Sequence, residues 1–240
     1  MEVTTILLIL SIIFISTLIR STLGFGDALI AMPLLALLIG LKTATPLVGL
    51  ISTSIGIPIL IRNWNLIDLK SIWQFIIAAF GGIILGVLFL KGTSEAIMKP
   101  ILGLVVVGAG IYNLIKPPVK PTIKSGWITF IFGFVAGMLG AAYNTSGPAI
   151  VIYGSLQKWS TEQFRVMLQG YSLPIGLLVI ISHGLAGLWT VSIWQLYILA
   201  LPIMAIAIFL GGKLNKLVPQ KQFKQVVNLT LILIGITLIN

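Results

Sequence analysis

Cysteine is absent from this 240-residue chain, which excludes disulfide bonds, thiolate metal sites and cysteine nucleophiles. Charge is also scarce: 8% of the residues are charged and 58% are hydrophobic, and the mean hydropathy is +1.13. A soluble domain needs more polar surface than so few charges supply. The composition therefore predicts an all-α polytopic membrane protein that lies in a lipid bilayer.

Catalytic patterns are missing as well. The chain has one histidine, His183, and it contains no His-Glu-x-x-His, no Gly-x-Ser-x-Gly and no carboxylate pair in an apolar segment. Without a base and a nucleophile we expect no enzyme, and we predict no metal and no cofactor. A lone histidine supports neither a metal cluster nor a catalytic triad, and we expect it at the membrane interface.

Apolar segments fill nearly the whole chain, and some are too short for a full span. A spanning helix needs about 20 residues, whereas segment 148–156 would rise only about 14 Å against a hydrocarbon core of about 30 Å. We predict that it is a half helix or part of a re-entrant hairpin. The apolar segments are 6–19, 29–41, 47–61, 71–90, 96–115, 126–142, 148–156, 166–188, 193–212 and 226–239.

The net charge of +10 is compatible with nucleic-acid binding, but the basic residues lie at the ends of apolar segments. We therefore expect no nucleic-acid partner and interpret the charges as topological. Because cytoplasmic loops carry the excess of Lys and Arg, the linker 116–125 and the loop around Lys216 are predicted to be cytoplasmic. The expected location is the plasma or inner membrane of the cell, with several spans.

The two halves of the chain resemble each other. A shift of 125 positions sets Gly86 on Gly211, and a shift of 116 sets Gly24 on Gly140, so the second half carries about nine extra residues after its break. Each half then holds an odd number of crossings, and we predict two inverted repeats with broken helices that meet near the midplane. The predicted division is a first transmembrane repeat at 1–115, a linker at 116–125 and a second transmembrane repeat at 126–240.

Two polar, glycine-rich breaks, 20–33 and 140–148, interrupt the apolar segments. Backbone that leaves a helix in hydrocarbon must bond to protein, water or ligand, and the helix that follows presents free N–H groups and its positive dipole end. The breaks are therefore the predicted anion site. The predicted substrate-binding residues are Arg20, Ser21, Thr22, Gly24, Gly26, Tyr143, Asn144, Thr145, Ser146, Gly147 and, on segment 166–188, Gln169 and Tyr171.

Close packing of helices is the alternative role for small residues. We expect two glycine pairs, each spaced four residues apart, to permit such close packing: Gly82 with Gly86, and Gly133 with Gly137. The hydroxyl groups near Tyr171 either face the breaks or bond to their own helix.

The charged residues of the first break have several readings. Arg20 either contacts the anionic substrate through its planar fork, pairs with Asp27, or lies at the headgroup level. Asp27, the only carboxylate inside an apolar segment, either carries a coupling proton or has a structural role as a helix cap or ion-pair partner.

The motifs of both breaks resemble a known family. Gly-x-Gly leading into Leu-Ile-Ala-Met-Pro33, and Gly-Phe-Val-Ala-Gly137-Met-Leu-Gly140 leading into Ser-Gly147-Pro148, resemble the TauE/SafE sulfite exporters, also called the 4-toluene sulfonate uptake permeases. The resemblance implies a secondary transporter of small anions such as sulfite, organosulfonates or carboxylates. Family members commonly have glycine where this chain has Asp27, a departure that bears on the substrate and on the coupling ion.

We therefore predict an anion transporter that works by alternating access around the paired breaks. A passive anion channel is the alternative, although no pore-lining polar stripe is evident. The partners implied are a small anion, a coupling proton or sodium ion, and lipid. The sequence leaves open the identity of the anion, import or export, and the oligomeric state.

Overall fold

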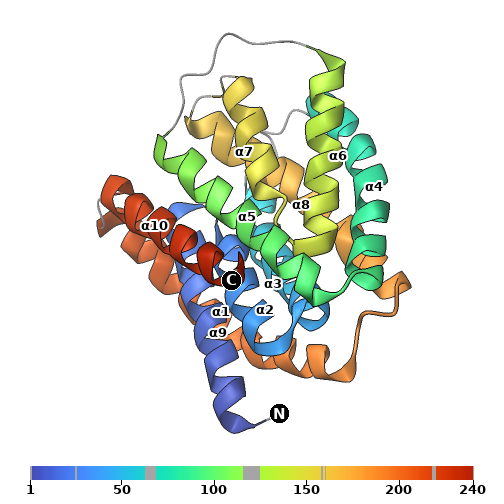
Figure 1. Cartoon of the computed structure of the whole chain (residues 1–240). Helices are drawn as coiled ribbons and strands as arrows, with labels where there is room; N and C mark the ends of the chain where they lie inside the picture. The colour runs from blue at the N-terminus through green and yellow to red at the C-terminus, as the bar shows by residue number, and fades with distance from the viewer. Residues whose placement is uncertain are drawn as a thin grey trace. The chain divides into compact units, whose positions relative to one another are not determined.

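The structure is a computed structural model that describes residues 2–24, 26–62, 69–115, 125–157, 159, 161–217 and 220–239. These residues form α-helices and no strand (Figure 1), which confirms the predicted all-α membrane fold. The helices are α1 (Val3–Leu23), α2 (Asp27–Ile39), α3 (Leu41–Arg62), α4 (Leu69–Gly92), α5 (Glu95–Ile115), α6 (Gly126–Tyr143), α7 (Gly147–Leu156), α8 (Thr161–Leu185), α9 (Val191–Leu217) and α10 (Gln220–Ile239).

Helix lengths separate candidate spans from shorter elements. In the described residues, 6 helices are long and apolar enough to cross a membrane: α1, α5 and α6, and most of α4, α9 and α10. By contrast, α2 has 13 residues and α7 has 10, so neither reaches the roughly 20 residues of a span. A short helix at the predicted half-span 148–156 is therefore present as α7.

The first compact unit contains Met1–Val48, Thr93–Pro117 and Trp189–Asn240. In it α1 packs along α9, α5 packs along α10, and α2 packs against α1. Small residues set these distances: a Cβ on Gly211 of α9 would lie 2.5 Å from the Cβ of Ser21 on α1, and one on Gly103 of α5 would lie 2.6 Å from the carbonyl oxygen of Gly235 on α10. The helix pairs can approach so closely only because these positions carry no side chain.

The second compact unit contains Gly49–Gly92 and Pro118–Leu188. Here α4 and α6 lie side by side (Figure 1), and α8 packs against α4, α6 and α7. A Cβ on Gly82 of α4 would overlap the carbonyl oxygen of Phe134, and one on Gly137 of α6 would overlap that of Ala79. The predicted packing role of these glycines is confirmed.

Each unit combines helices from both halves of the chain. The first unit takes α9 and α10 from the second half, and the second unit takes α4 and most of α3 from the first. Compact packing and the predicted repeats therefore divide the chain along different lines.

The helix bounds recur along the chain. α1 and α6 end 120 positions apart, at Leu23 and Tyr143, α3 and α8 begin 120 positions apart, and α5 and α10 begin 125 positions apart. The offset at the break is therefore 120 instead of the expected 116, and the second half gains five residues beyond the start of α8 instead of nine after its break. The expected offset is one helical turn short because small residues recur every three or four positions in α6, so that sequence matching cannot distinguish neighbouring turns.

Corresponding contacts occur in both units. Gly211 of α9 packs against Ser21 of α1 in the first unit, and Gly86 of α4 packs against Ala141 of α6 in the second. The glycines are 125 positions apart and their partners are 120 apart, the same offsets that the helix bounds give. The same helix contact is thus built twice, as a duplication predicts, while the inversion of one repeat relative to the other stays a prediction.

Candidate functional site

The first break separates α1 from α2 by two left-handed glycines. Gly24 has φ 88° and donates its N–H to the Arg20 carbonyl at 2.6 Å, and Gly26 has φ 99° and directly precedes α2. L-residues with a side chain rarely adopt these angles, so glycine is required for the chain to turn here. The helix break predicted from Gly24 and Gly26 is present.

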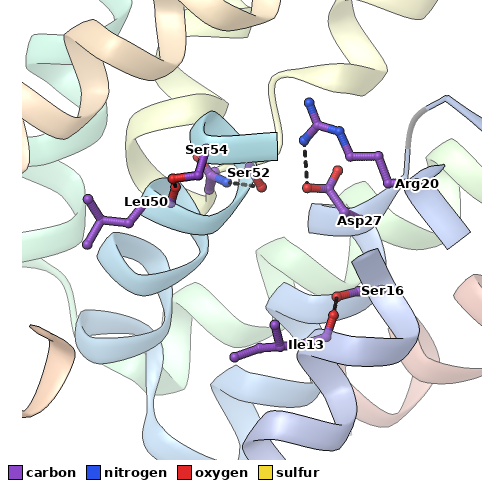
Figure 2. Close-up of polar contacts among 8 residues, drawn as sticks. Ile13, Ser16, Arg20, Asp27, Leu50, Ser52 and Ser54 are labelled. Atoms are coloured by element: carbon purple, nitrogen blue, oxygen red, sulfur yellow. Dashed lines mark hydrogen bonds and ion pairs between the residues drawn. The ribbon is translucent and has the colours of Figure 1, made fainter. Parts of the chain in front are cut away.

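A buried ion pair closes this break. Arg20, in the last turn of α1, bonds through Nη1 to Oδ2 of Asp27 at 2.7 Å, and the two side chains are 7% and 9% exposed (Figure 2). Asp27 is the first residue of α2, where its negative charge lies at the positive end of the helix dipole. Of the alternatives for Arg20, the structure contains the pair with Asp27. The first break thus balances its own charge.

The hydroxyl groups of the first break face α9. Thr22 donates to the Leu18 carbonyl at 2.8 Å and lies 3.4 Å from the carbonyl of Gly211, and its own carbonyl accepts a bond from the side chain of Asn215. The Ser21 Oγ is buried and has no hydrogen-bond partner among the described residues. Thr22 therefore helps to dock α9 onto the end of α1.

The second break separates α6 from α7. Asn144 follows α6 with φ 51°, the one positive φ of a residue other than glycine in the described part of the chain, and its N–H bonds to the Gly140 carbonyl at 2.7 Å. Asparagine tolerates this left-handed conformation better than most side chains. Pro148 then fits the first turn of α7, where its missing N–H costs nothing.

Asn144 is held by α3 within the same unit. Its Nδ2 donates to Oγ of Ser52 at 3.2 Å. A Cβ on Gly49, one turn earlier on α3, would lie 3.6 Å from the Asn144 Oδ1. The predicted site residue Asn144 thus has a polar partner on α3.

Thr145 differs from every other hydroxyl of the second break. Its side chain is 1% exposed, and its Oγ1 has no hydrogen-bond partner among the described residues. Ser146 is the N-cap of α7, is partly exposed and makes no side-chain cap bond. The first N–H groups of α7 therefore lack a side-chain acceptor.

The aromatic residues predicted for the site lie in packed surroundings. Tyr143 is 1% exposed and meets the Phe89 ring edge-on at 6.3 Å. Tyr171 is fully buried, and its ring centroid is 4.4 Å from that of Phe75. Trp159 stacks on Tyr171 at 5.6 Å, so Tyr171 belongs to an aromatic cluster of the second unit. The side chain of Gln169 lies outside the described residues.

One contact of the second break was not expected from the sequence. His183, expected at the membrane interface, is fully buried, and its Nε2 lies 2.8 Å from the carbonyl oxygen of Ala141. The side chain is buried because His183 lies in the last turn of α8, which packs against α6, and its depth in the membrane stays a prediction. A single histidine within an apolar segment was the signal that could have indicated a buried partner.

The described residues contain no group of three His, Cys, Asp or Glu that could hold a metal ion. What the breaks offer is hydrogen-bond donors, from hydroxyls and from helix N-termini, and one guanidinium bonded to a carboxylate. Helix N-termini and hydroxyl groups of this kind bind anions in proteins.

The helices that are long and apolar enough to cross a membrane define the class of multi-pass membrane proteins. The chain belongs to the sulfite exporter TauE/SafE family, whose family model matches residues 8–238. The family indicates a membrane exporter of sulfite or a related anion. Neither the curated proteins nor the solved structures contain a significant match to the chain.

Proposed function

We propose that this protein is a secondary transporter that binds a small oxyanion at its helix breaks and moves it by alternating access. The substrate class is sulfite, organosulfonates or related organosulfur or carboxylate compounds, and the location is the plasma or inner membrane. A proton or a sodium ion is the proposed coupling ion. Membership of the TauE/SafE family and the donor-rich second break support this proposal.

The observation that carries the proposal is the hydroxyl group of Thr145. A buried hydroxyl without a hydrogen bond costs about 1–3 kcal/mol, so proteins keep few of them without a reason. It lies two residues before Gly147, the first residue of α7, and the N–H groups at this helix start receive no side-chain cap from Ser146. A bound oxyanion supplies several acceptor oxygens at once and satisfies both kinds of donor.

Charge favours the second break as the main anion site. No Asp or Glu lies between Leu139 and Gln157, so nothing acidic in this stretch repels an anion from the positive end of α7. At the first break, the carboxylate of Asp27 already occupies the corresponding end of α2 and bonds to Arg20. An anion that contacts Arg20 has to share the guanidinium with Asp27. We therefore assign Arg20 an assisting role.

Counterflow in proteoliposomes tests this function. Vesicles with purified protein are loaded with unlabelled sulfite, isethionate, sulfate or acetate and are then given the labelled anion outside. A transporter that alternates concentrates the label transiently against its gradient, whereas a channel only equilibrates it. Equilibration without this overshoot would establish the channel alternative.

Replacing Thr145 by Val gives effects of opposite sign on stability and on binding. The substitution keeps the shape of the side chain and removes the unpartnered hydroxyl, so we expect the free energy of unfolding without substrate to rise by about 1 kcal/mol. The loss of one donor should weaken anion binding about tenfold. Thermal unfolding in detergent and equilibrium binding of sulfite measure the two effects.

Two control variants separate the site from general stability. Thr145→Ser keeps the donor and should retain the affinity. Thr17, in the body of α1, is also fully buried, and its Oγ1 has no hydrogen-bond partner among the described residues, so Thr17→Val should raise stability in the same way without changing the affinity. If Thr145→Val folds normally and binds the anion as tightly as the unmodified protein, the anion is held elsewhere.

A further inference from the structure

The single histidine of the chain bonds to the backbone at the end of α6. His183 on α8 is fully buried, and its Nε2 lies 2.8 Å from the carbonyl oxygen of Ala141. A carbonyl oxygen can only accept a hydrogen bond, so Nε2 carries the proton and donates it. Ala141 lies three residues before Asn144, the left-handed residue that ends the helix.

The carbonyl of Ala141 has lost its regular donor within α6 and needs a donor from another helix. In a continuous helix the carbonyl of Ala141 would accept the N–H of Thr145. At the break, that N–H bonds to the carbonyl of Leu139 at 3.2 Å instead, and the N–H of Asn144 bonds to the carbonyl of Gly140. The break thus removes the regular partner of the Ala141 carbonyl, and the imidazole of His183 replaces it.

The charge at this end of α6 makes the bond relevant to anion binding. The last carbonyls of a helix form its negative dipole end, which repels an anion bound at the start of the next helix. Only three residues, Asn144–Ser146, separate that end of α6 from the donor end of α7. A donor on a C-terminal carbonyl reduces the repulsion and fixes the direction in which the chain leaves α6.

We propose that His183 is a positioning residue for the anion site of the second break, a role that rests on the proposed function. It donates from Nε2 to the carbonyl of Ala141, holds the end of α6 in its turned conformation, and thereby keeps the donors of Thr145 and of the first turn of α7 aimed at one point. His183 acts through the backbone and does not touch the anion.

The tautomer of the ring supplies a spectroscopic test. Nδ1 of His183 is buried and has no hydrogen-bond partner among the described residues, so the neutral ring with the proton on Nε2 is expected. Because the chain contains one histidine, 15N-histidine labelling gives signals from this residue alone. We expect the Nε2–H tautomer, and we expect its signals to shift when sulfite saturates the purified protein. The Nδ1–H tautomer overturns the proposal.

Two amide side chains distinguish positioning from simple filling of space. Gln carries its amide nitrogen at about the position of Nε2, whereas Asn carries it at about the position of Nδ1. His183→Gln should therefore retain the sulfite affinity within about threefold, whereas His183→Asn and His183→Leu should weaken it about tenfold, as expected for a lost buried hydrogen bond. Thermal unfolding of the three variants shows whether each remains folded.

The outcomes separate this inference from the proposed function. If the unmodified protein binds none of the anions, the proposed function fails and the positioning role fails with it. If it binds sulfite but the Gln, Asn and Leu variants bind equally well, His183 has no positioning role while the proposed function stands. Weaker binding in all three variants, with normal folding, also overturns the proposal, because a donor at the Nε2 position should have rescued binding.

Discussion

Replacing Arg20 by Ala is expected to cost about 3–5 kcal/mol of the free energy of unfolding, the range for removing one partner of a buried ion pair. The guanidinium lies 2.7 Å from the carboxylate of Asp27, and both side chains are more than nine-tenths buried. Without the guanidinium, the buried carboxylate of Asp27 would lose this counter-charge while remaining shielded from water. Chemical unfolding in detergent micelles measures this loss.

Neutralising the carboxylate should repair most of the damage. In the double variant Arg20→Ala with Asp27→Asn, no orphaned charge remains, so most of the lost stability should return. The ion pair between Lys99 and Glu95, 2.9 Å apart with side chains 29% and 36% exposed, offers a matched comparison, and Lys99→Ala should cost less than about 1 kcal/mol. If Arg20→Ala is no more destabilising than Lys99→Ala, the Arg20–Asp27 pair does not hold the first break together.

The same variants test the contact of Arg20 with substrate. If Arg20 assists anion binding, the stable double variant should still bind sulfite more weakly than the unmodified protein. Arg20→Lys keeps the charge without the planar fork, so its affinity for sulfite should lie between that of the double variant and that of the unmodified protein. Full affinity in the double variant would limit Arg20 to its structural pair.

Gly82→Ala should be the other severely destabilising change, with a loss of about 3 kcal/mol or more and, at the limit, no folded protein. The added methyl group would overlap the carbonyl oxygen of Phe134 and lie 2.8 Å from the backbone nitrogen of Met138. Both are main-chain atoms of α6, so no side chain can rotate away and the two helices have to separate. Yield after size-exclusion chromatography and thermal unfolding measure the effect.

The neighbouring glycine is the control. A Cβ on Gly81, on the same helix, would lie 3.6 Å from the ring of Phe134, an ordinary contact distance. Gly81→Ala should therefore be tolerated, and it gains up to about 1 kcal/mol from the better helix propensity of Ala. Equal stability of the two variants would refute the close backbone approach of α4 and α6.

Local physical chemistry made much of this fold predictable. Long apolar segments require helices in a bilayer, because every backbone group must find a partner within its own segment. The breaks follow from single residues: Gly24 and Gly26 permit left-handed backbone, Asn144 tolerates it, and Pro148 suits the start of a helix. Such preferences act over a few neighbouring positions, so the sequence alone is sufficient to locate both breaks.

Contacts between distant segments were not predictable in the same way. The sequence left three alternatives for Arg20, because whether its side chain meets Asp27 depends on how α2 packs against α1. The burial of His183 depends on α8 packing against the end of α6, a pairing between positions 42 residues apart in the chain. No local pattern reports such a pairing.

The two threonines of the breaks show this division most clearly. The sequence determined that Thr22 and Thr145 both lie where an apolar helix is interrupted by small and polar residues, and it gave them the same expected role. In the folded chain the Thr22 hydroxyl bonds to the Leu18 carbonyl within its own helix and faces Gly211 of α9, whereas the Thr145 hydroxyl is buried and has no partner in the part of the chain that the structure describes. Only the tertiary structure decided which hydroxyl is left without an acceptor among the described residues, because that depends on which acceptors the surrounding helices bring within hydrogen-bond distance.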